Sequence, residues 1–174
     1  KVEVDQHFKT SISSDDLLAG YPFLSNLNLQ AGDFLKLTDG KGSKTDGSLR
    51  TFARDDIKDW VVTFSRLKII RLEEVRVFSW NGDQRAQQDY DLAYSSDAGK
   101  TFLPLAKEVR ASQNGASNLT RVPCQVDGVT DLRFTFRNPG EKNNSKNSLH
   151  SSILEIDAIG IPLLPLTFAE ARKA

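Results

Sequence analysis

The chain has 174 residues, of which 39% are hydrophobic and 26% charged, which fits one globular domain with a sizeable core and excludes a disordered chain. Lys and Arg together number 23, as do Asp and Glu, so the balanced charge gives no general attraction to nucleic acid or to an anionic membrane. No apolar run approaches the roughly 20 residues that a membrane-spanning helix needs.

The N-terminal part of the chain, residues 1–33, reads as an extended arm. Ser-Ser-Asp-Asp at 13–16 is expected to cap a short helical turn, and the Gly, Pro and Asn residues that follow interrupt any longer element. Tyr21, Phe23 and Leu24 are expected to pack this arm against the domain. No secretory leader is visible, and the chain is expected to be a processed or trimmed product.

Short apolar segments follow the arm, and each is expected to form a β-strand. Strands are expected over 34–38, over 60–64 and over 67–80, the last as one bent strand or two. The loop at 39–47 is rich in Gly, Ser and Asp, a composition typical of turns and also of calcium-binding loops. No amphipathic helices flank this loop, so it does not match a helix–loop–helix calcium site.

The clearest hairpin signal lies at 88–105. Tyr90, Leu92 and Tyr94 alternate with polar or small residues, which is the period of a half-buried strand. Ser-Asp-Ala-Gly at 96–99 supplies a turn, because Asp bonds its own backbone and Gly accepts a positive φ. Apolar residues after this turn begin the return strand.

Three further strands are expected over 119–126, 132–136 and 152–161, with a turn at 127–131 and a long polar loop at 138–148. About eight short strands without helix–strand alternation predict an all-β, two-sheet antiparallel sandwich, either a jelly roll or an immunoglobulin-like sandwich. The core is expected to contain the following residues: Trp60, Val62, Phe64, Val75, Val77, Tyr90, Leu92, Tyr94, Phe102, Phe134, Phe136, Ile156 and Ile159.

Four segments of the chain, in this order, resemble the galactose-binding-like jelly roll of discoidin-type domains and many carbohydrate-binding modules. They are Leu-Thr-Asp-Gly at 37–40, Val-x-Val at 75–77, Tyr-x-Leu-x-Tyr-Ser-x-Asp-x-Gly-x-x-Phe at 90–102 and Glu-Ile-x-x-Ile-Gly at 155–160. The resemblance covers residues 35–161 and favours the jelly roll over the immunoglobulin-like alternative.

This resemblance implies a binding domain over 34–161, preceded by the arm at 1–33 and followed by a tail at 162–174. It also implies a non-catalytic carbohydrate-binding or adhesion module of a secreted, periplasmic or cell-surface protein, with a glycan or glycoprotein as partner. The alternative is a structural or protein–protein interaction domain without a sugar site. A monomer is expected, because the sequence contains no heptad pattern that would drive association.

The sequence shows no motif of a catalytic site. A nucleophile elbow, a phosphate-binding loop and zinc-ligand spacing are all missing from it. The single cysteine, Cys124, excludes an intrachain disulfide, and neither His7 nor His150 is placed to serve it as a base. These observations favour a protein that is not an enzyme.

Two groups of residues at strand ends are candidates for sugar binding. They are Trp80 with Asn81 and Arg85, and Arg137 with Asn138 and His150. An aromatic ring stacks on the C–H face of a sugar while amide, imidazole or guanidinium groups bond its hydroxyls. Trp80 could instead simply cover a sheet edge, and Arg137 could be a solvated charge at a strand end. The loop at 138–150 is the first choice, because it is long and rich in Asn, Ser and Lys.

The resemblance also implies one structural Ca²⁺ ion, held by the loop after the first strand and by a Glu of the last strand. The matching residues are Asp39 and Glu155, with Asp46 as a further candidate ligand. These oxygens suit the hard Ca²⁺ ion. Lys41 and Lys44 depart from the usual loop, and a Lys ammonium in this position could replace the cation.

Overall fold

The computed structural model describes residues 1–6, 15–27, 29, 33–40, 49–50, 59–80, 82, 84–111, 117–137 and 152–163. These residues form the strands β1 (Glu3–Gln6), β2 (Leu24–Ser25), β3 (Leu49–Arg50), β4 (Asp59–Ser79), β5 (Gln88–Ser95), β6 (Leu103–Ala111), β7 (Asn118–Arg137) and β8 (Ser152–Pro162). Two short 3₁₀-helices, η1 (Asp33–Leu35) and η2 (Gln84–Ala86), complete the described elements. Within these ranges no helix has the length and apolar character that crossing a bilayer requires.

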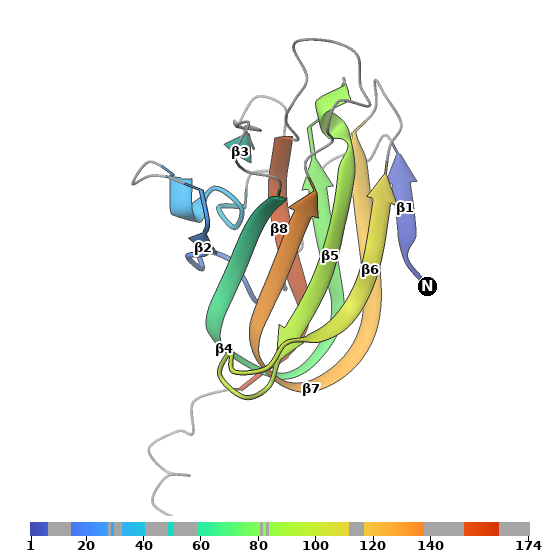
Figure 1. Cartoon of the computed structure of the whole chain (residues 1–174). Coiled ribbons are helices and arrows are strands. Elements are labelled where there is room, and N and C mark those ends of the chain that lie inside the picture. The colour runs from blue at the N-terminus through green and yellow to red at the C-terminus, as the bar shows by residue number, and fades with distance from the viewer. Residues whose placement is uncertain are drawn as a thin grey trace, which may run out of the picture.

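The long strands β4 and β7 each run through both layers of an antiparallel sandwich (Figure 1). They pair over 59–65 with 131–137 in the front layer of the view, and over 69–78 with 119–129 in the back layer. In front, β2 lies beside β4, and β5 and β6 extend the sheet beyond β7. Behind, β8 and β3 extend the sheet beyond β4, and β1 lies beside β7. The all-β, two-sheet sandwich is therefore confirmed, with 67–79 forming part of one bent strand, β4, and Trp80 following it.

The hydrophobic core lies between the two layers. Ten of the expected core residues are at most 4% exposed, namely Trp60, Val62, Phe64, Val75, Val77, Tyr90, Leu92, Phe134, Phe136 and Ile156. Tyr94, Phe102 and Ile159 are only half-buried. Tyr94 still packs against the core, whereas the placement of Phe102 and Ile159 in the core was wrong. The ring of Phe102 lies against the Arg133 guanidinium, whose Cζ is 3.6 Å from the ring centroid.

The strands β4 and β8 approach each other closely at Gly160. A Cβ atom at this position would lie 2.1 Å from the Arg71 carbonyl oxygen, so a larger residue would push the strands apart. The pairing of the two strands shifts register nearby, between Leu72 and Glu74. This close approach explains why the segment at 155–160 ends in a glycine.

The strand expected over 34–38 is not formed. Instead, η1 and the turn after it are closed by bonds from the Lys36 N–H to the Asp33 carbonyl over 3.1 Å and from the Thr38 N–H to the Leu35 carbonyl over 3.0 Å. These are i→i+3 bonds of the 3₁₀ type. The carbonyl of Thr38 accepts the Gly20 N–H over 2.6 Å. Backbone groups of this segment therefore bond locally and to the arm.

One expected break between strands was also wrong. The turn expected at 127–131 is a bend inside the continuous strand β7, where Gly128 has a φ of 66°. A glycine accepts this left-handed conformation without a Cβ clash, so the chain bends while its ladder continues.

The N-terminal arm contributes to the sandwich at its edges. β1 pairs with β7, and β2 pairs with the first half of β4. Phe23 is 2% exposed and packs edge-on against Trp60, with ring centroids 6.5 Å apart. Leu24, in contrast, is 63% exposed and does not anchor the arm, because it lies opposite Thr63 on the outer face.

Candidate functional site

One end of the sandwich, at the top of Figure 1, brings together the end of β4, the start of β8 and the short helix η2. The Trp80 backbone N–H, directly after β4, donates to the Ser152 carbonyl over 2.7 Å. Ser79 lies opposite Ile153 in the β4–β8 register. Trp80 and Arg85 of the first candidate group therefore lie at this end.

A buried polar network centred on Gln88 lies beneath this end. The Gln88 Nε2 lies 2.9 Å from the Val77 carbonyl, 3.0 Å from the Ser79 Oγ and 2.8 Å from the Asn118 carbonyl, and its two hydrogens are shared among these acceptors. The Gln88 Oε1 accepts the Thr120 hydroxyl over 2.7 Å. Gln88 is only 2% exposed, so its side-chain amide is fully used inside the protein. Such a satisfied network stiffens the elements that it joins.

The same network holds the end of η2. The Ala86 carbonyl accepts hydrogen bonds from the Asn118 Nδ2 over 2.9 Å and from the Ser79 hydroxyl. Two side chains, one from β7 and one from β4, therefore fix the last residue of η2. Because Arg85 directly precedes Ala86, this anchoring also limits where Arg85 can lie.

Arg85 and Trp80 form a cation–π pair. The Arg85 Cζ lies 4.9 Å from the centroid of the Trp80 ring, and both side chains are half-buried. This distance is within the roughly 6 Å over which such pairs attract. An indole ring beside a guanidinium offers an apolar face for stacking and directional donors for hydroxyl or carboxylate oxygens.

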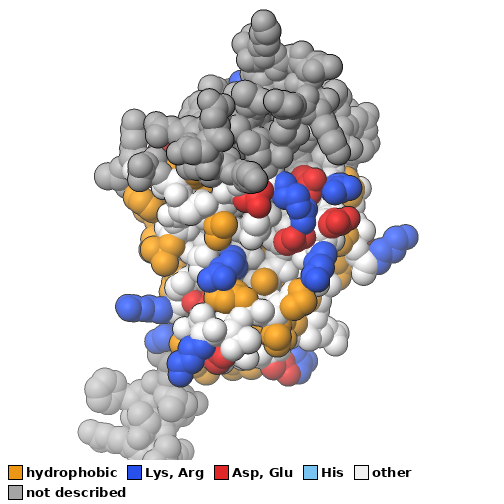
Figure 2. Space-filling model, viewed as in Figure 1, with side chains coloured by type: hydrophobic (Ala, Val, Ile, Leu, Met, Phe, Trp, Pro, Cys, Tyr) orange, Lys and Arg blue, Asp and Glu red, His pale blue; other side chains and the backbone are white. Residues whose placement is uncertain are grey.

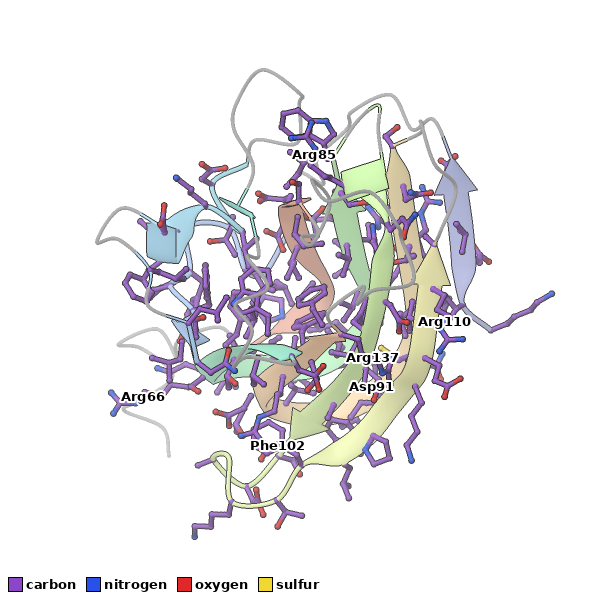
Figure 3. The ribbon with its side chains drawn as sticks, turned by 45° about the horizontal axis from the view of Figure 1, so that its top comes forward. Arg66, Arg85, Asp91, Phe102, Arg110 and Arg137 are labelled. Carbon is purple, nitrogen blue, oxygen red and sulfur yellow. The ribbon has the colours of Figure 1, made fainter. Side chains whose placement is uncertain are left out.

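Arg137, from the second candidate group, lies in a network of charges on the outer face of the front sheet. Its guanidinium bonds Asp91 over 2.5 Å and also bonds Asp89, which in turn pairs with Arg110 over 3.1 Å. Figure 2 shows basic and acidic side chains gathered together on this face. In Figure 3, Arg137 and Asp91 lie together, well apart from Arg85.

The charges in this network stabilise one another. The hydrogen bond to Asp91 raises the pKa of Arg137. Burial opposes ionisation of Asp91, but bonds from the Glu108 N–H and from Arg137 outweigh it and lower the pKa of Asp91. Arg137 is therefore held as a paired charge on the sheet. Of the other expected site residues, the following lie outside the described residues: Asn81, Asn138, His150 and Asp46.

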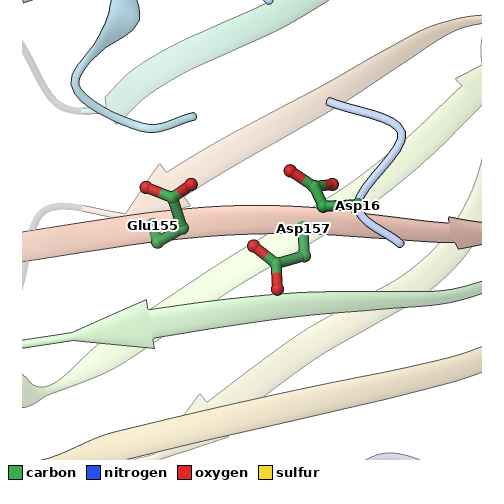
Figure 4. Close-up of side chains that lie close together, drawn as sticks. All are labelled: Asp16, Glu155 and Asp157. Carbon is green, nitrogen blue, oxygen red and sulfur yellow. The ribbon is translucent and has the colours of Figure 1, made fainter. Parts of the chain in front are cut away.

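Three carboxylates gather beside β8, at Asp16, Glu155 and Asp157 (Figure 4). One oxygen from each lies within 4.8 Å of the others. Glu155 and Asp157 are 0% exposed. The Asp16 Oδ1 accepts the Leu18 N–H over 2.9 Å and the Ala158 N–H over 2.8 Å, so this residue joins the local turn to β8. Residues 13 and 14 of the expected cap lie outside the described residues.

The environment of this cluster disfavours negative charge. Burial raises the pKa of Glu155 to about 8, with the nearby Asp157, Asp39 and Asp16 raising it further against the bond from the Gly40 N–H. Burial likewise raises the pKa of Asp16 to about 6. Within the described part of the chain, the Glu155 Oε2 and the Asp16 Oδ2 are buried without a hydrogen-bond partner. A hard divalent cation would satisfy these oxygens and offset their repulsion.

Asp16 and Asp157 were not expected in a metal site. Asp157 could have been found, because it follows Glu155 by two positions on a strand and side chains at this spacing share a face. Asp16 carried no such signal, because it is 142 positions from Ala158, the strand residue whose N–H it binds. Asp39 lies near enough to Glu155 to raise its pKa.

Solved structures that are similar to this chain include several carbohydrate-binding modules. The chain is similar to the CBM32-6 module of CpGH89 from Clostridium perfringens, at 17% identity and a TM-score of 0.54 over 83% of this chain and 98% of that one. It is similar to CpGH89 CBM32-4 in complex with GlcNAc-α-1,4-galactose, at 13% identity and a TM-score of 0.55 over 86% and 96% of the two chains.

A third similar structure is chitosan-binding module 1 of a chitosanase/glucanase from Paenibacillus sp. IK-5, at 13% identity and a TM-score of 0.53 over 83% of this chain and 98% of that one. Comparisons of the sequence with protein-family models and with curated proteins find no match. The chain therefore has the galactose-binding-like β-sandwich fold of carbohydrate-binding modules, as the four sequence segments indicated.

Proposed function

We propose that this chain is a non-catalytic carbohydrate-binding module of a secreted, periplasmic or cell-surface protein. The observation that carries the proposal is the Trp80–Arg85 pair, 4.9 Å apart at one end of a sandwich with this fold. Similar structures include a module in complex with GlcNAc-α-1,4-galactose, a chitosan-binding module and a pectin-binding module. A glycan with an apolar face for the indole and an oxygen for the guanidinium is therefore the proposed ligand.

The carboxylate cluster beside β8 favours a structural role over hydrolysis. A glycosidase needs carboxyl groups on both sides of a bound sugar. Glu155 and Asp157 are fully buried, so they have no access to a polysaccharide. We propose that these groups bind a structural Ca²⁺ together with Asp16, with Asp39 as a further ligand from the neighbouring loop. The ion would fasten the arm and the loop to β8.

The second candidate group, Arg137 with Asn138 and His150, remains the alternative glycan contact. The ion pairs of Arg137 with Asp89 and Asp91 favour the Trp80 group, because a sugar hydroxyl would have to compete with two carboxylates for that guanidinium. The titration described next shows which of the two groups binds the sugar.

An NMR titration of the amide signals with galactose, N-acetylglucosamine, chitosan oligomers and pectin oligomers tests the proposal. We expect weak, saturable shifts around Trp80 and Arg85, and loss of binding in Trp80→Ala. Phe102→Ala is the matched control, because Phe102 also stacks with an arginine, Arg133, but lies at the other end of the sandwich (Figure 3).

Three outcomes would change this assignment. Shifts confined to the Arg137 group would move the sugar site to that group. No shift with any glycan would favour a structural or protein–protein interaction domain. Release of shortened sugars from a bound oligomer would contradict the non-catalytic assignment.

A further inference from the structure

A pocket of about 270 Å³ lies where β4 bends and β8 ends. It is far from Trp80, because Ile69 of this bend pairs with Pro162, whereas Ser79 pairs with Ile153 at the opposite end of β8. Its walls are largely aliphatic and include Leu17 and Leu163. The volume is just below the roughly 300–1,000 Å³ of pockets for drug-sized molecules, so the pocket suits a small ligand.

The backbone around the pocket is fixed by a clamp from the N-terminal arm. The Tyr21 hydroxyl lies 2.9 Å from the Ser65 carbonyl and 3.0 Å from the Arg66 carbonyl, and its proton is donated to this pair of acceptors. Arg66 has a φ of 63°, in the left-handed region that side chains other than glycine rarely adopt. The Leu163 N–H donates to the Lys68 carbonyl over 2.7 Å and closes the other side.

The irregular backbone has a consequence for the side chains. The β4–β7 pairing skips from Ser65 to Ile69, so the residues between them are released from the ladder. Arg66 and Lys68 are two positions apart within this stretch, both are exposed, and both line the pocket. Figure 3 shows the Arg66 side chain extended from this edge of the molecule. Strained backbone of this kind is concentrated at functional sites.

These two cations differ from Arg71 and Arg110, which each have an acidic partner. Arg71, nearby on β4, pairs with Asp127 over 3.0 Å, and Arg110 pairs with Asp89 over 3.1 Å. Among the described residues, neither Arg66 nor Lys68 has an acidic partner. None of the described residues that line the pocket is acidic. Two positive charges therefore stand at the rim of an apolar pocket, which favours an anion with an apolar body.

We propose that this pocket is a second binding site, which takes a small carboxylate with an aliphatic body. The carboxylate lies at the rim between Arg66 and Lys68, where a guanidinium can bond both oxygens. The body lies against Leu17, Ile69 and Leu163. This site does not depend on the proposed glycan site, because the two lie at different ends of the sandwich.

Hexanoate, hexanol and acetate are the probes that test this site in the full chain. We expect hexanoate to give saturable NMR shifts at the amides of Arg66, Lys68 and Leu163, weaker in high salt. Hexanol lacks the charge, so it should bind roughly threefold to fivefold more weakly, the size of one exposed ion pair. Acetate keeps the charge but lacks the aliphatic body, so it should also bind more weakly, because it buries less apolar surface. Equal binding of hexanol and hexanoate, or no hexanoate binding, would overturn the proposal.

Matched variants separate the pocket from general charge. Arg66→Gln and Lys68→Gln should each weaken hexanoate binding by roughly threefold to fivefold. Arg71→Gln is the control, because it removes an equal charge from the same strand without touching the pocket. An equal loss of affinity in Arg71→Gln would show that hexanoate responds only to the overall positive potential at this end of the sandwich. That result would contradict the site.

A second pair of variants tests the apolar wall. Leu163 and Leu103 are similarly exposed, at 54% and 48%, but only Leu163 lines the pocket. Leu163→Ala should therefore weaken hexanoate binding, while Leu103→Ala should not. Unchanged binding in a folded Leu163→Ala protein would place the probe elsewhere.

Discussion

The Gly40 backbone N–H donates to the Oε1 of Glu155 over 3.0 Å, across 115 positions of the chain. This bond joins the segment after η1 to the buried face of β8. The other oxygen of the same carboxylate, Oε2, is buried without a hydrogen-bond partner in the described part of the chain. Ionisation of Glu155 is therefore unfavourable unless a cation is present, and this has consequences for stability.

The first prediction concerns the pH dependence of the metal-free protein. Burial raises the pKa of Glu155 from 4.5 to about 8 and that of Asp16 from 3.8 to about 6. An acid with a raised pKa in the folded state contributes stability that is fully present below its unfolded pKa and lost as pH rises. In EDTA, we expect the free energy of unfolding, measured by urea denaturation, to fall between about pH 4 and pH 8.

Glu155→Gln removes the ionisable group and keeps an oxygen for the Gly40 N–H. Because one pKa unit corresponds to about 1.4 kcal/mol, this variant should be more stable than the parent by roughly 2–4 kcal/mol at pH 8. Glu73→Gln is the control, since Glu73 is exposed on β4. An unchanged pH profile in Glu155→Gln would show that Glu155 titrates normally.

The second prediction concerns calcium. Ca²⁺ at about 100 times its Kd stabilises a folded protein by about 2.7 kcal/mol, which for this chain length is roughly 5–11 °C in Tm. We expect this rise after chelation and Ca²⁺ addition, larger at pH 8.5 than at pH 6, because Ca²⁺ binds ionised carboxylates. Asp157→Asn should abolish it, and comparison of Asp16→Asn with Asp39→Asn identifies the further ligands. An unchanged Tm in the parent would contradict the site.

The sequence predicted features that depend on the residue pattern along one strand, and it missed features that depend on bonds to distant segments. Tyr90, Leu92 and Phe134 were placed in strands and in the core, because alternation along a strand records which face is buried. The segment at 34–38 has apolar residues as well, but its backbone bonds are local and its Thr38 carbonyl is taken by the arm. Composition does not record such a bond, so a strand was expected there.

The candidate site was predictable to the same extent. Trp80 and Arg85 are near neighbours in sequence, so their meeting at one strand end could be expected. Arg137 forms ion pairs with Asp89 and Asp91 of another strand, and only the β5–β7 register shows that these residues lie beside it. The residue pattern of one strand does not show which residues of the neighbouring strand lie opposite it.

The third prediction concerns the centre of the core. Phe134 is 0% exposed, and its ring contacts Phe64, Tyr90 and Phe136 at centroid distances of 6.1, 5.9 and 5.8 Å. Phe134→Ala should lower the free energy of unfolding by about 3–5 kcal/mol through lost burial and the cavity that remains. In urea denaturation Leu103→Ala, at a half-exposed position, should cost far less. Equal losses would argue against a core between these layers.

The fourth prediction links the buried network to glycan binding. Gln88→Met keeps the length of the side chain but removes the amide donor from the carbonyls of Val77 and Asn118, and the Asn118 carbonyl keeps the Ser79 hydroxyl, 3.2 Å away, as a side-chain donor. Since each unsatisfied buried group costs about 1–3 kcal/mol, we expect a loss of roughly 2–4 kcal/mol in the free energy of unfolding. The end of η2 should also loosen, because Ser79 and Asn118 hold both Gln88 and Ala86.

This loosening should weaken glycan binding at Trp80 and shift the Trp80 fluorescence in Gln88→Met, measured at a temperature where the variant remains folded. Leu132→Ala serves as the control, because it removes a fully buried side chain away from η2 and costs about 2–5 kcal/mol by itself. If the network positions Arg85 against Trp80, glycan affinity falls in Gln88→Met and stays near the parent value in Leu132→Ala. An equal fall in both variants would mean that affinity follows overall stability, and an unchanged affinity in Gln88→Met would mean that the pair forms without the network.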